Sequence, residues 1–352
     1  MNPDNALPKI IRDGKPHPAE NGRISLSSRL TMYGEGFFDT LRAYNGGFLL
    51  PERHLERLHK GMQYLGLAIP ETLSDTGRFL ELLARFLGIN QAMDDQIRIR
   101  IQVWADDNTS GYLPGGSASG GRAAVQKTSG PESNKDTSSP EGLNPRRTAR
   151  YMISGVRMER PVPSNAAPAH AKSAATDKPN LAETSIDFAS APPVTLFAGR
   201  YRRIPAESLP ADVKWSNGVN YILAAGEARH HGADDALMLT RDGYISETTI
   251  ANLFWKSGDR VFTPSVDCDL LPGITRSLVM DVLDEMMVEV QEGRFFPAEL
   301  QKAEMVWACN SVRELYPVAG IDGRSCPVDD RFWNLLRETF QSRKRKMLKY
   351  VH

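Results

Sequence analysis

Two stretches of low sequence complexity constrain what this chain can fold into more than any other feature. Residues 115–149 are rich in Gly, Ser and Pro, and residues 163–193 are rich in Ala and Pro, with few large apolar side chains in either. Such stretches cannot bury enough apolar area to offset the entropy lost when their backbone is ordered. The folded core must therefore come from the rest of the 352 residues, which is enough chain for two domains.

The positions of the two stretches suggest how the domains are divided. Residues 150–158, between them, alternate as a β-strand does, so the first stretch is predicted to be an insertion between two strands of one domain. The second stretch is predicted to be an interdomain linker. The expected organisation is a small α/β domain at 1–162, the linker at 163–193, and a larger domain at 194–352.

Hydrophobic periodicity predicts an α+β fold for the first domain. Asn45, Gly46 and Gly47 accept positive φ angles, so residues 37–50 are expected to form a β-hairpin. Pro51 is typical of the first turn of a helix, and apolar residues at every third or fourth position continue that helix. The other expected elements are a helix at 79–89 and an alternating strand at 96–104, with Ile97, Ile99, Ile101 and Val103 on one face and Arg98, Arg100, Gln102 and Trp104 on the other.

The second half of the chain shows the same mixture of strands and helices. Asp242-Gly243 predicts the turn of a hairpin at 235–247, and a Pro-Gly turn predicts the start of a helix at 272–286. The other expected elements are a strand at 194–203, a helix at 220–232, a hairpin at 252–264, a buried strand at 304–311 and an amphipathic C-terminal helix.

Charge balance, hydropathy and cysteine spacing argue against several classes of function. Lys plus Arg and Asp plus Glu both number 43, and this balance argues against nucleic acid or an anionic membrane surface as the main partner. The chain contains no apolar run of about 18 residues, so no membrane span is expected. Cys268, Cys309 and Cys326 are widely spaced and form no CxxC motif, which predicts a reduced, cytoplasmic protein without a metal site.

Four features that are far apart in the chain suggest a single chemistry. Arg57 lies in the first predicted helix, Lys214 lies just before a helix, and Glu247 ends a strand. The fourth feature, "LPGITR" at 271–276, begins a helix at a glycine turn. Each alone has an ordinary structural explanation, because most isolated charged residues are solvated surface residues. Together they supply the groups that one cofactor, pyridoxal 5′-phosphate, requires.

That cofactor needs an amine to react with its aldehyde, a carboxylate to keep its ring nitrogen protonated, and an anion site for its phosphate. Lys214 would supply the amine and Glu247 the carboxylate. A helix that starts at a glycine exposes backbone N–H groups, and an arginine adds a bidentate positive charge. Residues 273–275 and Arg57 are therefore expected to bind the phosphate.

The chain also resembles the class IV, or fold-type IV, pyridoxal-phosphate enzymes, which include branched-chain and D-amino acid aminotransferases and aminodeoxychorismate lyase. Four blocks in the family's order carry the resemblance: "YGEGFFDTLRAYNGGFLLPERHLERL", "GADDALMLTRDGYISETTIANLFW", "LPGITR" and "CNSVRELYPV". It extends from residue 9 to about residue 325, apart from the two low-complexity stretches. It implies a small α/β domain plus a larger barrel-like α/β domain, with the cofactor between them, in a homodimer.

The resemblance also implies roles for individual residues. Lys214 would form the Schiff base and shuttle the proton, and Glu247 would pair with the pyridinium. The residues implied in holding the phosphate are Arg57, Gly273, Ile274 and Thr275, with Asn310 and Ser311 near it. Phe38 and Thr40 match positions that line the pocket. Core or strand packing explains the last four residues (Phe38, Thr40, Asn310 and Ser311) equally well.

Three positions bear on the reaction. Arg98 matches an arginine that branched-chain enzymes use near the substrate carboxylate, although a solvent-facing arginine fits its strand as well. Ala105 stands where lyases and D-amino acid aminotransferases carry arginine, and Thr248 stands where branched-chain enzymes carry glycine. The expected function is amino-group transfer between an L-amino acid, with branched-chain amino acids as candidates, and a 2-oxo acid. One alternative is 4-amino-4-deoxychorismate lyase, which releases pyruvate and 4-aminobenzoate. Another is a non-catalytic binding protein of the same fold.

Overall fold

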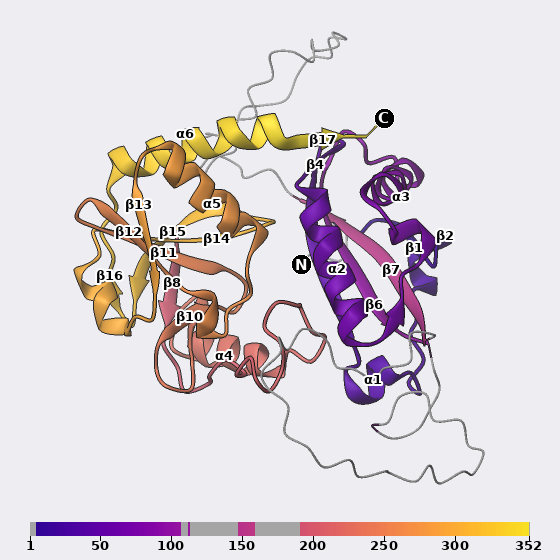
Figure 1. The fold of residues 1–352 in the computed structure, drawn as a ribbon, viewed down its shortest axis with the longest axis horizontal. Helices are drawn as coiled ribbons and strands as arrows, with labels where there is room; N and C mark the ends of the chain where they lie inside the picture. The colour runs from indigo at the N-terminus through magenta and orange to yellow at the C-terminus, as the bar shows by residue number, and fades with distance from the viewer. Residues whose placement is uncertain (1–4, 107–111, 113–146, 159–190, 352) are drawn as a thin grey trace, which may run out of the picture. The chain divides into compact units, whose positions relative to one another are not determined.

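The computed structural model describes residues 5–106, 112, 147–158 and 191–351. The chain forms two compact units, whose elements are labelled in Figure 1. The first contains Met1–Arg157, Pro210–Val219 and Met347–His352, and the second contains Met158–Leu209 and Asn220–Lys346. The expected insertion and the expected linker lie outside the described residues, apart from the last three residues of each.

The first unit is built on an eight-stranded sheet with the order β17-β4-β3-β6-β7-β1-β2, in which β5 also pairs with β7. All the pairs except β5–β7 are antiparallel. The strands are β1 Lys9–Arg12, β2 Lys15–Pro18, β3 Gly36–Tyr44, β4 Gly47–Leu49, β5 Leu67–Ala68, β6 Gln96–Ala105, β7 Arg147–Arg157 and β17 Leu348–Tyr350. The hairpin expected at 37–50 is confirmed, with φ angles of 49° at Asn45 and 78° at Gly46 between β3 and β4.

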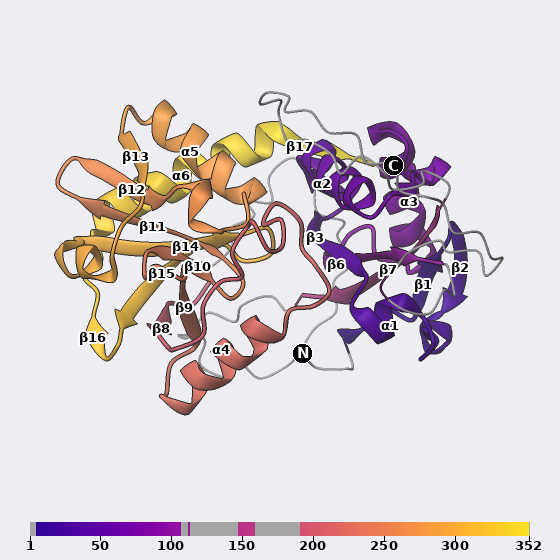
Figure 2. The same ribbon diagram turned by 60° about the horizontal axis from the view of Figure 1, so that its bottom comes forward.

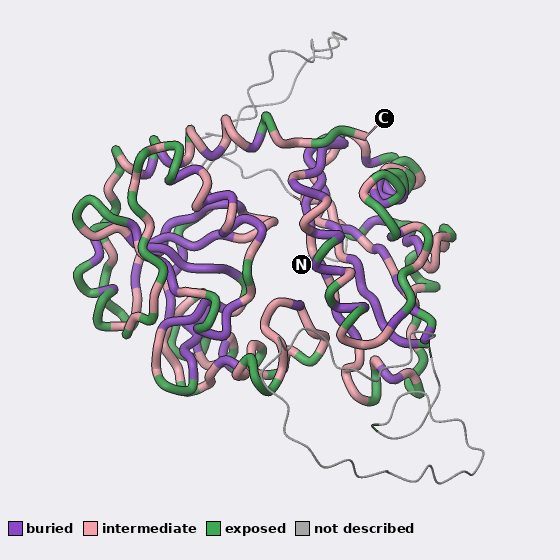
Figure 3. The backbone as a smooth tube through the Cα atoms, in the orientation of Figure 1, coloured by how far each residue is buried: buried purple, intermediate pink, exposed green. Residues whose placement is uncertain are grey.

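Two helices provide the apolar cover of this sheet. Helices α2 (Pro51–Tyr64) and α3 (Thr76–Ile89) lie on one side of it, and the short α1 (Arg29–Tyr33) precedes β3 (Figures 1 and 2). Because strand residues alternate between faces, β6 turns every second side chain toward these helices. All four apolar residues expected on that face of β6 are fully buried, namely Ile97, Ile99, Ile101 and Val103. In Figure 3 the central strands are coloured mainly as buried residues.

The second unit contains a nine-stranded sheet with the order β10-β9-β8-β15-β14-β11-β12-β13, with β16 paired to β15. Its strands are β8 Val194–Phe197, β9 Asp235–Leu239, β10 Ile245–Thr248, β11 Asn252–Ser257, β12 Arg260–Pro264, β13 Glu289–Gly293, β14 Met305–Asn310, β15 Glu314–Ile321 and β16 Arg324–Ser325. Ile245 of β10 donates its N–H to Phe295 O, two residues beyond β13, at 2.8 Å. This bond joins the two ends of the strand order, so the sheet curls into the expected barrel-like form.

Three helices accompany this sheet: α4 (Val219–His230), α5 (Ile274–Glu285) and α6 (Asp330–Met347). The hairpins expected at 235–247 and 252–264 are confirmed by the antiparallel pairs β9–β10 and β11–β12. The core of the unit is formed mainly by apolar residues on the strands, including Leu253, Trp255, Val306 and Val318. None of the helices described is long and apolar enough to cross a lipid bilayer.

Two segments assigned to the first unit differ from the expected domain boundaries, and long-range pairing explains both. Pro210–Val219 and Met347–His352 were expected in the larger domain but belong to the first unit. The first segment bonds to the start of β3, and the second contributes β17, which pairs with β4. Two strands also differ from their predicted bounds. β7 begins at Arg147 instead of residue 150, and β8 ends at Phe197 instead of residue 203.

Candidate active site

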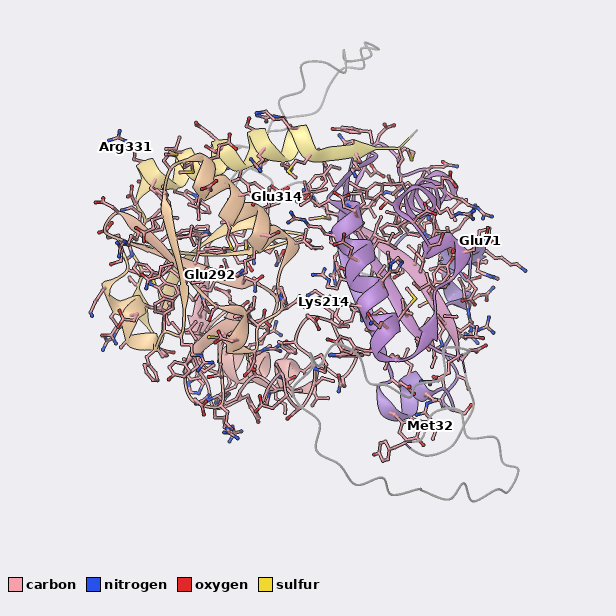
Figure 4. The ribbon with its side chains drawn as sticks, viewed as in Figure 1. Met32, Glu71, Lys214, Glu292, Glu314 and Arg331 are labelled. Carbon is pink, nitrogen blue, oxygen red and sulfur yellow. The ribbon has the colours of Figure 1, made fainter. Side chains whose placement is uncertain are left out.

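Lys214, labelled in Figure 4, lies on a segment that extends the sheet of the first unit beside β3. Phe38 donates its N–H to Lys214 O at 2.8 Å, and Ser216 donates its N–H to Gly36 O at 2.9 Å. These two bonds form a short antiparallel bridge. The position of Lys214 is therefore set by backbone pairing and not by a loose loop.

The sequence neighbours of Lys214 determine the side on which its amine projects. Val213 is 4% exposed and belongs to the core of the unit, and Trp215 packs against the same core. Because successive side chains in an extended segment point to opposite sides, Lys214 projects away from this core. Its Nζ lies 5.9 Å from the centre of the Phe38 ring.

The sheet face opposite α2 and α3 carries Phe38, Thr40, Arg98, Arg100 and Gln102, and we call it the polar face. Phe38 pairs with Gln102 across the two strands, and Thr40 pairs with Arg100. Arg100 Cζ lies 3.5 Å from the centre of the Phe38 ring. The structure thus brings the predicted residues Lys214, Phe38 and Thr40 together, with Arg100 beside them.

Arg100 was not singled out from the sequence, whereas Arg98 was. Arg98 pairs with Arg42, so on the polar face Arg98 lies one position further from Phe38 than Arg100 does. Burial and the charge of Arg98 lower the pKa of Arg100 to about 10, and burial also lowers the pKa of Arg98. Arg100 forms no ion pair with any acidic residue among those described. A partly buried guanidinium without an acidic partner can bind a carboxylate.

Arg57 is held by a buried carboxylate on the other side of β3. Its Nε and Nη2 donate to Asp39 Oδ2 and Oδ1 at 2.9 and 2.7 Å, and His54 Nδ1 lies 3.1 Å from Oδ1. Asp39 is fully buried on the α2 side, whereas Phe38 and Thr40 point to the polar face. Nη1 of Arg57 has no partner among the described residues, so it can contact an anion. The phosphate role of Arg57 stays a prediction.

Replacing Asp39 with asparagine is expected to lower the free energy of unfolding by about 3–5 kcal/mol, because it leaves Arg57 buried without a counter-charge. Burial alone would raise the pKa of Asp39, but Arg57 and His54 hold it below its usual value. The stabilisation is therefore present at neutral pH and is lost as the pH falls below about 4 toward this lowered pKa. Urea unfolding at pH 7 and pH 3 measures both effects. Asp95→Asn, which removes a half-exposed partner of Arg157, serves as the control and should change little.

In the second unit, Glu247 is buried and has partners for both carboxylate oxygens. Oε2 accepts from the Leu271 N–H at 3.2 Å and from Asn252 Nδ2 at 3.3 Å. Oε1 accepts from the Tyr221 hydroxyl at 3.3 Å and lies 3.4 Å from Arg203 Nε. These contacts fix the carboxylate in one orientation. None of the four partners was expected from the sequence, because each comes from a different part of the chain.

The start of α5 has the features of an anion site. Gly273 is the N-cap and no side chain caps the helix, while Ile274 and Thr275 are buried in its first turn. A Cβ added at Gly273 would collide with Asn252 Oδ1, so any other residue there would displace the Asn252 side chain. Asn252 also donates to Leu271 O at 2.9 Å, which links this turn to Glu247. The structure thus brings together the predicted carboxylate and the predicted phosphate turn.

Asn310 and Ser311 lie where β14 ends. Asn310 Oδ1 accepts the N–H groups of Val312 and Arg313 at 3.0 and 2.8 Å, and Nδ2 donates to Ile250 O at 3.3 Å. The Asn310 side chain therefore stabilises a turn, as asparagine often does. Ser311 is partly exposed in this turn. Both phosphate contacts stay predictions, and Ser311 is the better candidate because its hydroxyl has no such internal role among the described residues.

Each unit by itself presents groups that suit pyridoxal 5′-phosphate. The first unit presents a primary amine beside an aromatic ring, and the second presents an oriented carboxylate and an uncapped helix start. These are the groups that an aldehyde, a pyridinium nitrogen and a phosphate require. Within the described ranges, no three His, Cys, Asp or Glu residues lie close enough to hold a metal ion.

Comparison with solved structures identifies the fold as that of the fold-type IV enzymes. A branched-chain aminotransferase from Thermoproteus uzoniensis, solved with norvaline, has a TM-score of 0.75 and covers 99% of this chain and 100% of its own. Its sequence is 19% identical, so the likeness concerns the fold. The family model "Amino-transferase class IV" matches residues 36–148 and 147–321. The chain belongs to this family, whose enzymes use pyridoxal phosphate.

Two activities are named among relatives of this chain. A putative branched-chain-amino-acid aminotransferase from Methanocaldococcus jannaschii is 25% identical over 316 residues, which is 90% of this chain and 88% of its own length. The aminodeoxychorismate lyase of Bacillus subtilis is 24% identical over 291 residues, 83% of this chain and 79% of its own. An Arabidopsis thaliana branched-chain-amino-acid aminotransferase-like protein 2 is 38% identical over 131 residues. That match spans 37% of this chain but only 23% of the plant protein.

Proposed function

We propose that this chain is a pyridoxal-phosphate-dependent aminotransferase that moves an amino group between an L-amino acid and a 2-oxo acid. The placement of the Lys214 amine on the polar face, beside Phe38 and Arg100, carries the proposal. The amine can bond to an aldehyde, and the guanidinium can bind the carboxylate that amino acids and 2-oxo acids share.

When bound, pyridoxal phosphate supplies an aldehyde that condenses with amines and a ring that accepts electrons from the substrate Cα. Lys214 Nζ is the proposed attachment point, and it then takes and returns the Cα proton. Glu247 holds a proton on the ring nitrogen through its negative charge. Arg57 in the first unit, and Gly273 to Thr275 at the start of α5 in the second, would each offer groups that bind a phosphate.

Branched-chain amino acids are the first substrates to test. The M. jannaschii relative, whose name states this activity, aligns over 90% of the chain. On this proposal Arg100 binds the substrate carboxylate, because it lies over the Phe38 ring, and Arg98 is the alternative.

Aminodeoxychorismate lyase activity is the second candidate, and one observation favours it. Arg98 and Arg100 both belong to the polar face, and aminodeoxychorismate carries two carboxylates that two arginines could bind. The B. subtilis lyase also aligns over 83% of the chain. Ala105, which replaces the arginine expected in the lyases, weighs against it.

Measuring the amount of product released per site, with no 2-oxo acid present as amino-group acceptor, separates the aminotransferase from the lyase. Purified protein is loaded with pyridoxal phosphate and given L-amino acids, D-amino acids or aminodeoxychorismate, with no 2-oxo acid present. An aminotransferase releases at most one oxo acid per site and loses its yellow colour, whereas a lyase continues to release pyruvate. A protein that never turns yellow and forms no product would instead support a non-catalytic binding role.

The proposal extends to a homodimer, as the family resemblance implies. Helix α4 presents Ile222 and Leu223 to solvent, 71% and 44% exposed, on a face that also contains Gly226. An exposed apolar helix face of this kind suits an interface with a second copy. Sedimentation equilibrium should give twice the chain mass for the wild type and a lower mass for Ile222→Lys. A monomeric wild type would contradict the proposal.

We also propose that the protein works in the cytoplasm on small-molecule substrates. Cys268, Cys309 and Cys326 are all free thiols, which suits a reducing compartment. Cell fractionation with an antibody against the chain tests this location.

A further inference from the structure

We propose that Gln102 is a positioning residue that holds Lys214 and Arg100 in their relative places on the polar face. Gln102 is 8% exposed, and its amide bonds to Arg100 and to the segment that carries Lys214. Nε2 donates to Ser216 Oγ at 2.8 Å and to Phe37 O at 2.9 Å. Oε1 accepts from Arg100 Nη2 at 2.9 Å. The inference rests on the proposed function and adds a residue to it.

The bond to Ser216 acts on the lysine side. Ser216 lies two residues beyond Lys214, so in an extended segment both side chains point to the same side. Two backbone bonds join this segment to β3, and the Gln102–Ser216 bond adds a third attachment on the side where the amine projects. Without it, the segment keeps its backbone register, but the side chain of Lys214 has more freedom.

The bond to Arg100 acts on the carboxylate side. A guanidinium that is partly buried needs an acceptor to fix its orientation, and Gln102 Oε1 provides a neutral one. A neutral acceptor orients Arg100 without cancelling its charge, so the charge stays available for a substrate carboxylate. A glutamate at this position would still orient Arg100 but would neutralise it. The amide is therefore the group that suits both tasks.

A purely structural role for Gln102 makes a different prediction, and Gln96 provides the matched control. Gln96 lies on the same strand, accepts from Arg42 Nε at 3.0 Å and donates to Asn45 Oδ1 at 3.2 Å. It pairs with Tyr44, at the opposite end of β3 from Lys214's partner Phe38. Replacing either glutamine with methionine removes its amide contacts from the same sheet.

The experiment compares wild type, Gln102→Met and Gln96→Met as apoproteins. Each is mixed with pyridoxal phosphate in a stopped-flow instrument, and the rate of yellow colour formation is measured at saturating cofactor. Borohydride trapping and peptide mapping then identify the modified lysine. Gln102→Met should slow attachment at Lys214 roughly 10- to 100-fold, and Gln96→Met should change it less than about twofold. Equal rates in wild type and Gln102→Met, or equal slowing in both variants, would overturn the inference.

Two further variants separate the two sides of the amide. Ser216→Ala should slow attachment while leaving the substrate KM near that of wild type. Gln102→Glu should raise KM for carboxylate substrates about tenfold or more, because it neutralises Arg100. If Gln102→Met does not fold, these two variants still test whether Gln102 positions Lys214 and Arg100. The inference fails if Ser216→Ala attaches the cofactor at the wild-type rate. A wild type that gives no adduct at Lys214 would reject the proposed function as well.

Discussion

Lys214→Ala protein should give no borohydride-trapped cofactor and should lose activity by roughly 100- to 10,000-fold, the usual contribution of a positioned proton-transfer group. The amine that the cofactor aldehyde requires would be gone, and no described lysine other than Lys214 lies over the Phe38 ring. Trapping followed by peptide mapping measures attachment, and oxo acid production measures activity. Folding should be retained, since the segment keeps its two backbone bonds to β3.

Lys60→Ala is the matched control for that experiment. Lys60 is 57% exposed and forms an ion pair with Asp212, on the same segment as Lys214. Its loss should leave both trapping and turnover close to wild type, because an exposed ion pair stabilises little. Trapping of cofactor at some other lysine in the Lys214→Ala protein would show that the attachment site has been assigned wrongly.

Glu247→Gln protein should still bind the cofactor but should turn over roughly 100-fold more slowly or worse. The amide keeps the shape of the carboxylate and can still accept from the Leu271 N–H, so the site remains formed. What it removes is the negative charge that keeps a pyridine nitrogen protonated. Cofactor affinity by equilibrium dialysis and kcat by oxo acid release separate binding from catalysis.

The appropriate comparison is Glu304→Gln, which removes a half-exposed carboxylate from the same unit, where it pairs with Lys256. This variant should retain kcat. If Glu247→Gln also turned over at the wild-type rate, Glu247 would have no part in holding the ring nitrogen. If it failed to bind cofactor, the loss would instead reflect the contacts with Tyr221 and Asn252.

The elements that could be predicted from the sequence are those set by local chemistry. The turn at Asn45-Gly46 and the one at Asp242-Gly243 place residues that tolerate positive φ between alternating strands, and both hairpins are present. The glycine before α5 was expected for a different reason, the close approach of its backbone to an anion, and its φ is −69°. Pairing between distant segments could not be predicted in this way. The attachment of 210–219 and of β17 to the first unit depends on strand edges whose neighbours the local pattern does not reveal.

In the candidate site, too, local sequence patterns predicted some features, whereas others depend on pairing between distant segments. Alternation in β6 placed Arg98 and Arg100 on one face, but choosing between them requires the register of β6 against β3. Asn310 looked like a phosphate ligand from its block, whereas its amide oxygen is used by two local N–H groups. Arg203 and Tyr221 approach Glu247 only through the folding of the barrel-like sheet. Sequence motifs thus indicated candidate reacting groups and did not reveal the residues that contact and orient them.

The continuous register of β6 and β7 has a practical use. The two strands remain paired from Ile97↔Arg157 to Ala105↔Ala149, so the chain leaves and re-enters this ladder at adjacent points. Lengthening a connection whose ends are already held together costs only about 0.6 kcal/mol for each doubling. A fluorescent reporter or affinity tag could therefore be spliced between these two strands, so that the protein can be followed in living cells.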